Sequence, residues 1–222
     1  MVSPAKAHFM RATAAQAAAQ VGARNPMRNA TGYELMLAQL DAHKRRLKQI
    51  QSIQRKIEVK RELLGEYTPY VDGVLEAGRG AQDDVLMSVM VWRIDTGDTV
   101  GGLAIARYAL AHGLTMPDQY SRDAATLIAE EFAETALAAR SADQPVDLAT
   151  LIEVGELVRD KDMPDEVRAK LHKAIGYALS ADDKAASLTH LQQALQLHDR
   201  AGVKKDIERL EREIRNMPPP GG

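Results

Sequence analysis

Two neighbouring carboxylates, Asp83 and Asp84, are the candidates in this chain for metal-dependent chemistry. With a third carboxylate they would hold Mg²⁺, as metal-assisted cleavage of a nucleic-acid strand requires. The alternative role is structural, because an aspartate at a helix start accepts hydrogen bonds from the free amide groups there. An Asp pair at such a position is more often a cap, so both residues are weak catalytic candidates and we expect no metal site.

The other motifs for catalysis or nucleotide binding are incomplete. Glu58-Val59-Lys60 matches the end of a nuclease motif but falls in an expected helix, whereas that motif needs a pair of strands. Gly78-Arg79-Gly80 lacks the Lys-Ser/Thr that completes a phosphate-binding loop. The six histidines have no HxxxH or HxH spacing, and the absence of cysteine excludes thiolate chemistry. We therefore expect no cofactor and no intrinsic catalysis.

Composition favours a fold made only of helices. Hydrophobic residues make up 45% of the 222 residues, which is enough for a substantial core, but aromatic residues make up only 4%. Alanine and leucine dominate the apolar set, which is typical of helices packed on helices. No apolar run reaches the roughly 18 residues of a membrane span, so we expect no membrane partner.

The small net charge of −2 hides a strong asymmetry. Residues 1–64 hold twelve Lys and Arg against four Asp and Glu, whereas the remainder holds 17 basic and 27 acidic residues. A basic arm on an acidic body is typical of proteins that meet a polyanion.

One long helix is predicted from Thr31 to about Leu64, ended by the segment 65–69. Thr31 and Glu34 have the spacing of a capping box at its start. Apolar residues follow in an interrupted heptad pattern, which favours a coiled-coil-like helix packed against another helix of the same or a neighbouring subunit. The residues of this seam, our candidates for oligomerisation, are Leu40, Leu47, Ile50, Ile57 and Leu64.

The same helix carries most of the basic arm, and we expect these cations to contact double-stranded DNA. Lys44, Arg45 and Lys48 would share one helical face, with Arg55 two turns further along. Cations on such a face displace the counterions condensed on DNA. The alternative is a solvated coiled-coil surface. The candidate DNA-binding residues are Lys44, Arg45, Arg46, Lys48, Arg55, Lys56, Lys60 and Arg61.

The centre of the fold is predicted to be a helical hairpin over residues 83–112. Its first helix is apolar, Gly97 and Asp98 form the turn, and Gly113 ends the second helix. Shifting the sequence by 85 positions aligns Asp98 with Asp183 and suggests a second, loosely tetratricopeptide-like hairpin.

The remaining segments complete the predicted organisation. Further helices are expected over Ala124–Arg140, from Leu148 to about Arg159, after Pro164, and over Lys204–Arg215. The predicted domains are a flexible segment 1–30, the basic helix 31–66, a helical-hairpin body 67–216 and a disordered tail 217–222.

Several segments resemble the small terminase subunit of temperate tailed phages that package DNA from cohesive-end sites, a family also labelled terminase, endonuclease subunit. They are residues 1–11, 60–64, 73–117, 163–173 and 188–213, of which GAQDD and AGVKK are the most specific. The resemblance implies a DNA-packaging protein that recognises viral DNA, forms a homo-oligomer such as a ring, and regulates a large subunit with ATPase and nuclease activity. It also implies action in the host cell cytoplasm.

Two other functions stay open at this point. The family label implies endonuclease activity, so the chain could itself cut the packaging site with a metal ion. Alternatively, it could be a structural adaptor whose helical body binds a protein without direct DNA contact.

Overall fold

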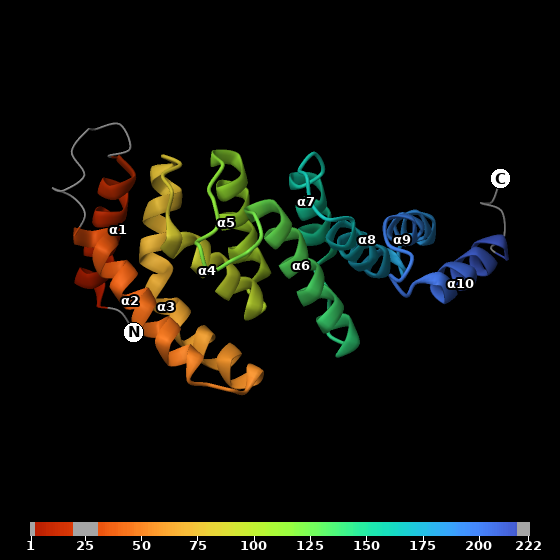
Figure 1. Ribbon diagram of the computed structural model, residues 1–222, viewed down its shortest axis with the longest axis horizontal. Coiled ribbons are helices and arrows are strands. Elements are labelled where there is room, and N and C mark those ends of the chain that lie inside the picture. The colour runs from red at the N-terminus through yellow and green to blue at the C-terminus, as the bar shows by residue number, and fades with distance from the viewer. Residues whose placement is uncertain (1–2, 20–30, 217–222) are drawn as a thin grey trace. The chain divides into compact units, whose positions relative to one another are not determined.

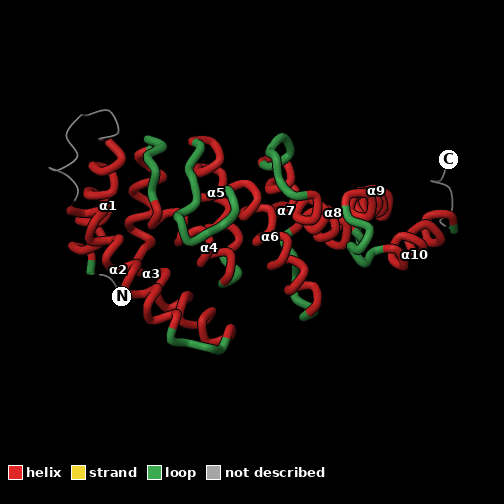
Figure 2. The backbone as a smooth tube through the Cα atoms, in the orientation of Figure 1, coloured by secondary structure: helices red, strands yellow, loops and turns green. Residues whose placement is uncertain are grey.

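The computed structural model describes residues 3–19 and 31–216 of the chain (Figure 1). These two ranges contain ten helices and no strand, which confirms the all-helical prediction (Figure 2). The chain forms two compact units, Met1–Ala124 and Ala125–Gly222. Residues of the predicted body 67–216 fall in both units, and the predicted tail 217–222 lies outside the described residues.

The first unit is built around one helix that is buried on all sides. Its helices are α1 (Pro4–Ala19), α2 (Thr31–Lys48), α3 (Ile53–Ala77), α4 (Asp84–Asp95) and α5 (Thr99–His112). Nearly every residue of α4 is buried, including Trp92, because α2, α3 and α5 all pack against it. A helix that is apolar around its circumference needs such a cover. The sequence prediction that this stretch organises the fold is therefore right for the first unit.

The predicted α4–α5 hairpin is confirmed in detail. Gly97 adopts a φ of +83° in the turn, and the Asp98 side chain accepts a hydrogen bond from the Gly101 amide at 2.9 Å. Gly113 ends α5 with a φ of +66°. A Cβ atom on Gly102 would lie 2.7 Å from Cγ1 of Ile94, so the helices approach more closely than any larger residue would permit.

The prediction of one helix from Thr31 to Leu64 is wrong. The chain turns back at residues 49–52, where the Ser52 hydroxyl accepts a hydrogen bond from the Arg55 amide at 3.2 Å and caps α3. The helix then continues through Gly65 and Pro69 to Ala77. Its buried stripe keeps helical spacing across the proline, and this packing outweighs the one lost amide donor. The stripe consists of Val59, Leu63, Tyr67, Tyr70 and Val74.

Within the segment predicted as flexible, residues 1–30, the structure describes a helix, α1. Helix α1 packs along α3 and also contacts α2. Met10 is its buried anchor, and an ion pair of 3.8 Å joins Arg11 to Asp72 of α3. Met10 precedes the Ala- and Gln-rich stretch 13–20, which contains no large apolar residue. Residues 20–30 lie outside the described ranges.

The second unit contains five further helices, close to the predicted bounds. They are α6 (Ala124–Ser141), α7 (Leu148–Leu157), α8 (Asp165–Leu179), α9 (Lys184–Leu197) and α10 (Lys204–Arg215). Asp147 caps α7 by accepting hydrogen bonds from the amide and the hydroxyl of Thr150. Leu191 of α9 packs with Val203, Ile207 and Leu210 in an apolar cluster that joins α9 to α10.

Helices α8 and α9 form the second hairpin at the predicted place. Asp183 caps α9 by accepting a hydrogen bond from the Ala186 amide at 2.9 Å. Gly176 of α8 faces Leu191 of α9, and the buried Ser187 hydroxyl donates to the Gly176 carbonyl at 2.6 Å. The two helices therefore lie close together. The tetratricopeptide-like comparison itself stays a prediction.

Candidate nucleic-acid interface

Helices α2 and α3 run antiparallel and bring six of the eight predicted basic residues to the closed end of a hairpin. Three contacts hold the two helices together: Gln39 to Glu66 at 2.9 Å, the His43 ring nitrogen to the Tyr67 hydroxyl at 2.8 Å, and Arg46 to Glu62 at 3.6 Å. We call residues 44–56 the basic tip; they comprise the end of α2, the connection 49–52 and the start of α3. The tip lies at the bottom of the view in Figure 1.

Three of the predicted basic residues contact the rest of the first unit and hold the hairpin in place. Lys60 forms an ion pair with Asp95 at the end of α4, and both side chains are mostly buried. Arg61 donates to the Thr96 carbonyl at 3.1 Å, and Lys44 donates to the Gln119 side chain at 3.0 Å. Burial lowers the pKa of Lys44 below its usual value. These three cations therefore hold the hairpin against α4 and the 113–123 segment.

Two arginines of the basic tip are exposed but already paired with acids. Arg55 contacts Glu58 at 2.7 Å and reaches Glu62 at 4.0 Å, and the hydrogen bond that Arg55 donates to Glu58 raises the pKa of Arg55 above its usual value. Glu62 also contacts Arg46. Exposed pairs of this kind are worth little in free energy and exchange partners easily. Both guanidinium groups can therefore turn from carboxylate to phosphate at small cost.

Three basic side chains of the tip have no acidic partner among the residues that the structure describes: Arg45, Lys48 and Lys56. Arg45 and Lys48 are exposed and stand one turn apart on α2, and Lys56 is half-buried in the first turn of α3. Arg45 and Lys48 also lie in the last turn of α2, where cations stabilise the negative end of the helix dipole. The surface that remains free for an anion thus lies at the tip; it includes Arg45 and Lys48 of the predicted face but not the fastened Lys44.

The predicted apolar seam is divided between two helices. Leu40 and Leu47 are buried inside the first unit, where α2 packs against the neighbouring helices. Ile50, Ile57 and Leu64 are half-buried. The buried stripe of α3 follows Val59 and Leu63, so Ile57 and Leu64 lie at its margins. A continuous seam across 40–64 does not form, and oligomerisation through these residues stays a prediction.

The carboxylates considered for metal binding occupy separate structural positions. Asp83 is buried and caps α4, as predicted: it accepts from the Leu86 amide at 2.8 Å and from the Tyr70 hydroxyl at 2.5 Å. Burial raises the pKa of the Asp83 carboxyl, and these hydrogen bonds oppose that rise. Asp84 accepts from the Gln82 amide group at 3.1 Å. Within the described ranges, no three His, Cys, Asp or Glu residues are grouped as a metal site would need.

The side chains of the nuclease-like triplet, Glu58-Val59-Lys60, also point to different surroundings. Val59 is buried in the stripe of α3, whereas Glu58 turns toward Arg55 and Lys60 toward Asp95. The two charged side chains thus have different partners on different elements. Glu58 and Lys60 belong to the ion pairs that frame and fasten the hairpin.

Comparison with known proteins gives a consistent assignment. Residues 37–166, more than half of the chain, match the phage small terminase subunit family. A protein of Escherichia phage P2 named "Terminase, endonuclease subunit" is 53% identical over 99% of this chain and 89% of its own length. The chain belongs to the phage small terminase subunit family.

A more distant relative agrees with this membership. A protein of Haemophilus phage HP1 named "Probable terminase, endonuclease subunit" is 27% identical over 69% of this chain and 60% of its own length. No solved structure matches the chain. The region matched by the small terminase family begins within α2 and ends early in α8, so it includes the whole basic tip.

The second unit contains a pair of histidines whose contact could not be predicted from the sequence. His172 of α8 and His190 of α9 face each other with their Nδ1 atoms 3.0 Å apart. Burial, followed by the neighbouring His190, lowers the pKa of His172 to about 4, and burial also lowers that of His190. Since 18 positions separate the two residues, only the hairpin fold brings them together.

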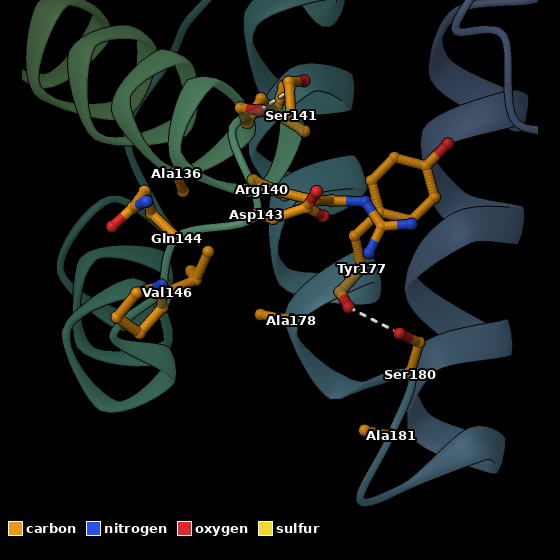
Figure 3. Close-up of a pocket in the computed structure, with 13 residues that line it drawn as sticks. Ala136, Arg140, Ser141, Asp143, Gln144, Val146, Tyr177, Ala178, Ser180 and Ala181 are labelled. Atoms are coloured by element: carbon orange, nitrogen blue, oxygen red, sulfur yellow. Dashed lines mark hydrogen bonds between the residues drawn. The ribbon is translucent and has the colours of Figure 1, made fainter.

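The second unit also contains a pocket of about 750 Å³ between the end of α6, the following loop and α8 (Figure 3). Figure 3 shows the Arg140 side chain over the Tyr177 ring, with the guanidinium carbon 4.2 Å from the ring centroid. The Tyr177 hydroxyl donates to Asp206 of α10 at 2.9 Å. The pocket is lined by one cation, Arg140, one carboxylate, Asp143, and mostly small polar and apolar residues. This combination favours no particular class of ligand.

Among the described helices, none is both long and apolar enough to cross a membrane.

Proposed function

We propose that this small terminase subunit binds double-stranded viral DNA through the basic tip of its α2–α3 hairpin. The observation that carries the proposal is the set of three cations, Arg45, Lys48 and Lys56, without acidic partners in the described structure. Double-stranded DNA carries about one negative charge per 1.7 Å of helix axis and therefore attracts such a surface. The bound protein would assemble with the large terminase subunit, the ATPase and nuclease, and regulate it during genome packaging.

Self-association is a second part of the proposal. One tip offers few phosphate contacts, so a single copy would bind DNA weakly. Several tips in a homo-oligomer, such as a ring, would bind together with a much higher apparent affinity. The half-buried Ile50, Ile57 and Leu64 are the candidates from the predicted seam that stay accessible to another copy. The protein would act in the cytoplasm of the host cell, because the viral DNA is there.

A charge-reversal variant tests DNA binding. In Arg45→Glu with Lys48→Glu, we expect unchanged helicity and oligomer mass and DNA binding at least about tenfold weaker at low salt. The slope of log affinity against log salt should fall by about 1.8 for two lost phosphate contacts. A matched control is Lys204→Glu with Lys205→Glu, two exposed lysines at the start of α10. Equal binding by the two double variants would refute a DNA-binding role for the tip.

An endonuclease role is the second candidate, and the names of both relatives favour it. It requires cation-dependent nicking by the purified protein alone. Loss of nicking in Asp83→Asn or Asp84→Asn, with fold and DNA binding intact, would support it. A role as an adaptor without DNA contact is the third candidate, and salt-dependent binding of DNA to the wild-type protein would exclude it.

A further inference from the structure

The most exposed large hydrophobic side chain of the described residues stands in the middle of the basic tip. Ile53 is 73% exposed, whereas Leu47, Val59 and Leu63 nearby are buried. It is the first residue of α3, directly after the turn 49–52. An apolar side chain in this position does not contribute to the core of its own unit.

The backbone holds Ile53 rigidly at the end of the hairpin. Ser52 caps α3 through the Arg55 amide, and the Lys56 amide donates to the Ser52 carbonyl at 3.0 Å. The isoleucine side chain is itself stiff, because branching at Cβ restricts its χ1 angle. An exposed group of this kind loses little conformational entropy when it enters a binding partner.

The charges around Ile53 indicate what that partner is. Lys56 is one helical turn further along α3, while Arg45 and Lys48 end α2 on the other side of the turn. The buried cores of protein–protein interfaces are depleted in charged residues, so a protein partner fits this setting poorly. Double-stranded DNA fits it well, because phosphates line both edges of a groove and an apolar side chain that enters between base pairs contacts their apolar faces.

We propose that Ile53 is an apolar wedge that enters between base pairs at a deformable step and bends the DNA, while the flanking cations hold the phosphates. This inference rests on the proposed function of the basic tip. Proteins that bind the minor groove commonly insert one apolar side chain in this way and kink the duplex by about 20–90°. Specificity then comes from the step that unstacks most easily, and TA and CA steps are the most flexible.

The test compares Ile53→Ser with Val100→Ser. Val100 is a matched control, because it is also a β-branched residue in the first turn of a capped helix and is 69% exposed. The probes are end-labelled duplexes of about 30 base pairs, with a central TA step or with an A-tract of equal base composition. Energy transfer between the ends measures the bend, and titration at several salt concentrations gives the affinity and its salt slope.

We expect the wild-type protein and Val100→Ser to bend the TA duplex and to prefer it to the A-tract. Ile53→Ser should bind it about tenfold more weakly, lose the bend and the preference, and keep the salt slope, because no charge is removed. Ile53→Leu should retain the bend, since it keeps an apolar group of equal size.

Three results would overturn the wedge. Normal bending by Ile53→Ser, together with weak binding by Arg45→Glu/Lys48→Glu, leaves the DNA-binding role intact and refutes the wedge alone. A lower oligomer mass in Ile53→Ser, with DNA bending unchanged, assigns the side chain to contact between copies. Unchanged binding by both the Ile53 and the charge-reversal variants refutes the wedge and the proposed function together.

Discussion

In the α4–α5 hairpin, Asp98 starts the second helix by accepting a hydrogen bond from the Gly101 amide. In the α8–α9 hairpin, Asp183 does the same with the Ala186 amide, and both bonds measure 2.9 Å. These aspartates are 85 positions apart, which is the shift that aligns the two sequences. The cap is therefore the constant part of the two hairpins, because it fixes the residue at which the second helix begins.

The contact between the paired helices differs. In the first hairpin the small residue lies on the second helix, where Gly102 faces Ile94. In the second hairpin it lies on the first helix, where Gly176 faces Leu191. Either helix can thus supply the small residue that permits a close approach, provided that the partner supplies a large one. Sequence alignment of such hairpins should therefore follow the caps and not the glycines.

The hairpins also differ in burial, and replacing their aligned aromatic residues should give the largest effect. Trp92 is buried and packs edge-on against Tyr67, whereas Tyr177 is half-buried beneath Arg140. Trp92→Ala should lower the free energy of unfolding by about 3–5 kcal/mol. Tyr177→Ala should lower it by only about 1–2 kcal/mol. Urea unfolding followed by circular dichroism measures both losses, and equal losses would mean that the burial difference has no energetic consequence.

The starts of the two hairpins should respond differently to loss of the capping side chain. Asp83 caps α4 and also receives the Tyr70 hydroxyl, whereas Pro164 begins α8 without a side-chain hydrogen bond. Asp83→Ala removes the cap and leaves a buried hydroxyl unpaired, so it should cost about 2–3 kcal/mol. Pro164→Ala should cost at most about 1 kcal/mol.

Thermal unfolding measures this second difference. Asp83→Asn, which keeps an acceptor for the Leu86 amide, should recover part of the loss. A structural role for Asp83 also requires that any DNA cleavage by the complete terminase survive the substitution in the folded fraction. If Pro164→Ala proves as damaging as Asp83→Ala, the cap is not what distinguishes the two starts.

Substituting the two small residues should reveal the exchanged packing. A clash of about 1–3 kcal/mol, offset by about 1 kcal/mol of helix propensity, is expected for both Gly102→Ala and Gly176→Ala. The cost of Gly102→Ala should largely disappear in an Ile94→Ala background, and that of Gly176→Ala in a Leu191→Ala background. Double-mutant cycles measure these couplings. Additive losses would show that the glycines are not sites of close contact.

The smallest expected difference is in acid sensitivity. The pKa of His172 is lowered to about 4 in the folded second hairpin, chiefly by burial, while its ordinary value is 6.5. The unfolded chain therefore takes up the proton first, so stability should fall as pH drops from about 6.5 towards 4 and should be insensitive to this group above that range. Because the pair is half-buried, we expect about 1 kcal/mol rather than the full linkage energy.

Hydrogen exchange as a function of pH checks this in each hairpin separately. Amides of α8 and α9 should lose protection on acidification more steeply than those of α4 and α5. His172→Gln should reduce that difference. An equally steep loss in the variant would mean that the histidine pair is not responsible.

Local signals in the sequence predicted the helices wherever caps and glycines mark the ends. The turn at Gly97 and Asp98 and the end of α5 at Gly113 follow from such signals. The prediction of one long basic helix is wrong because Ser52 caps a new helix, and because α3 continues through Pro69 instead of ending before it. The helix continues through Pro69 because Tyr67 and Tyr70 pack against the rest of the unit. No local sequence pattern contains this tertiary packing.

The candidate site was predictable in composition but not in geometry. The sequence identified the eight basic residues, but the partners of three of them come from distant segments: Asp95 for Lys60, Thr96 for Arg61 and Gln119 for Lys44. These contacts separate the fastening cations from the free ones. The exposure of Ile53 was equally hidden, because the heptad pattern placed this residue within a continuous helix.

The continuity of α3 through Pro69 has a mechanical consequence. The helix is one rod of 25 residues, about 37 Å long, that starts at the tip and ends within the packed body of the first unit. If DNA bound to the tip moves, the force on the tip would be transmitted along α3 and through the Lys60–Asp95 ion pair to the end of α4. Pro69 has no backbone N–H, so the helix lacks one interior hydrogen bond at this position. A force on the tip would therefore reach α4, the most deeply buried helix of this unit.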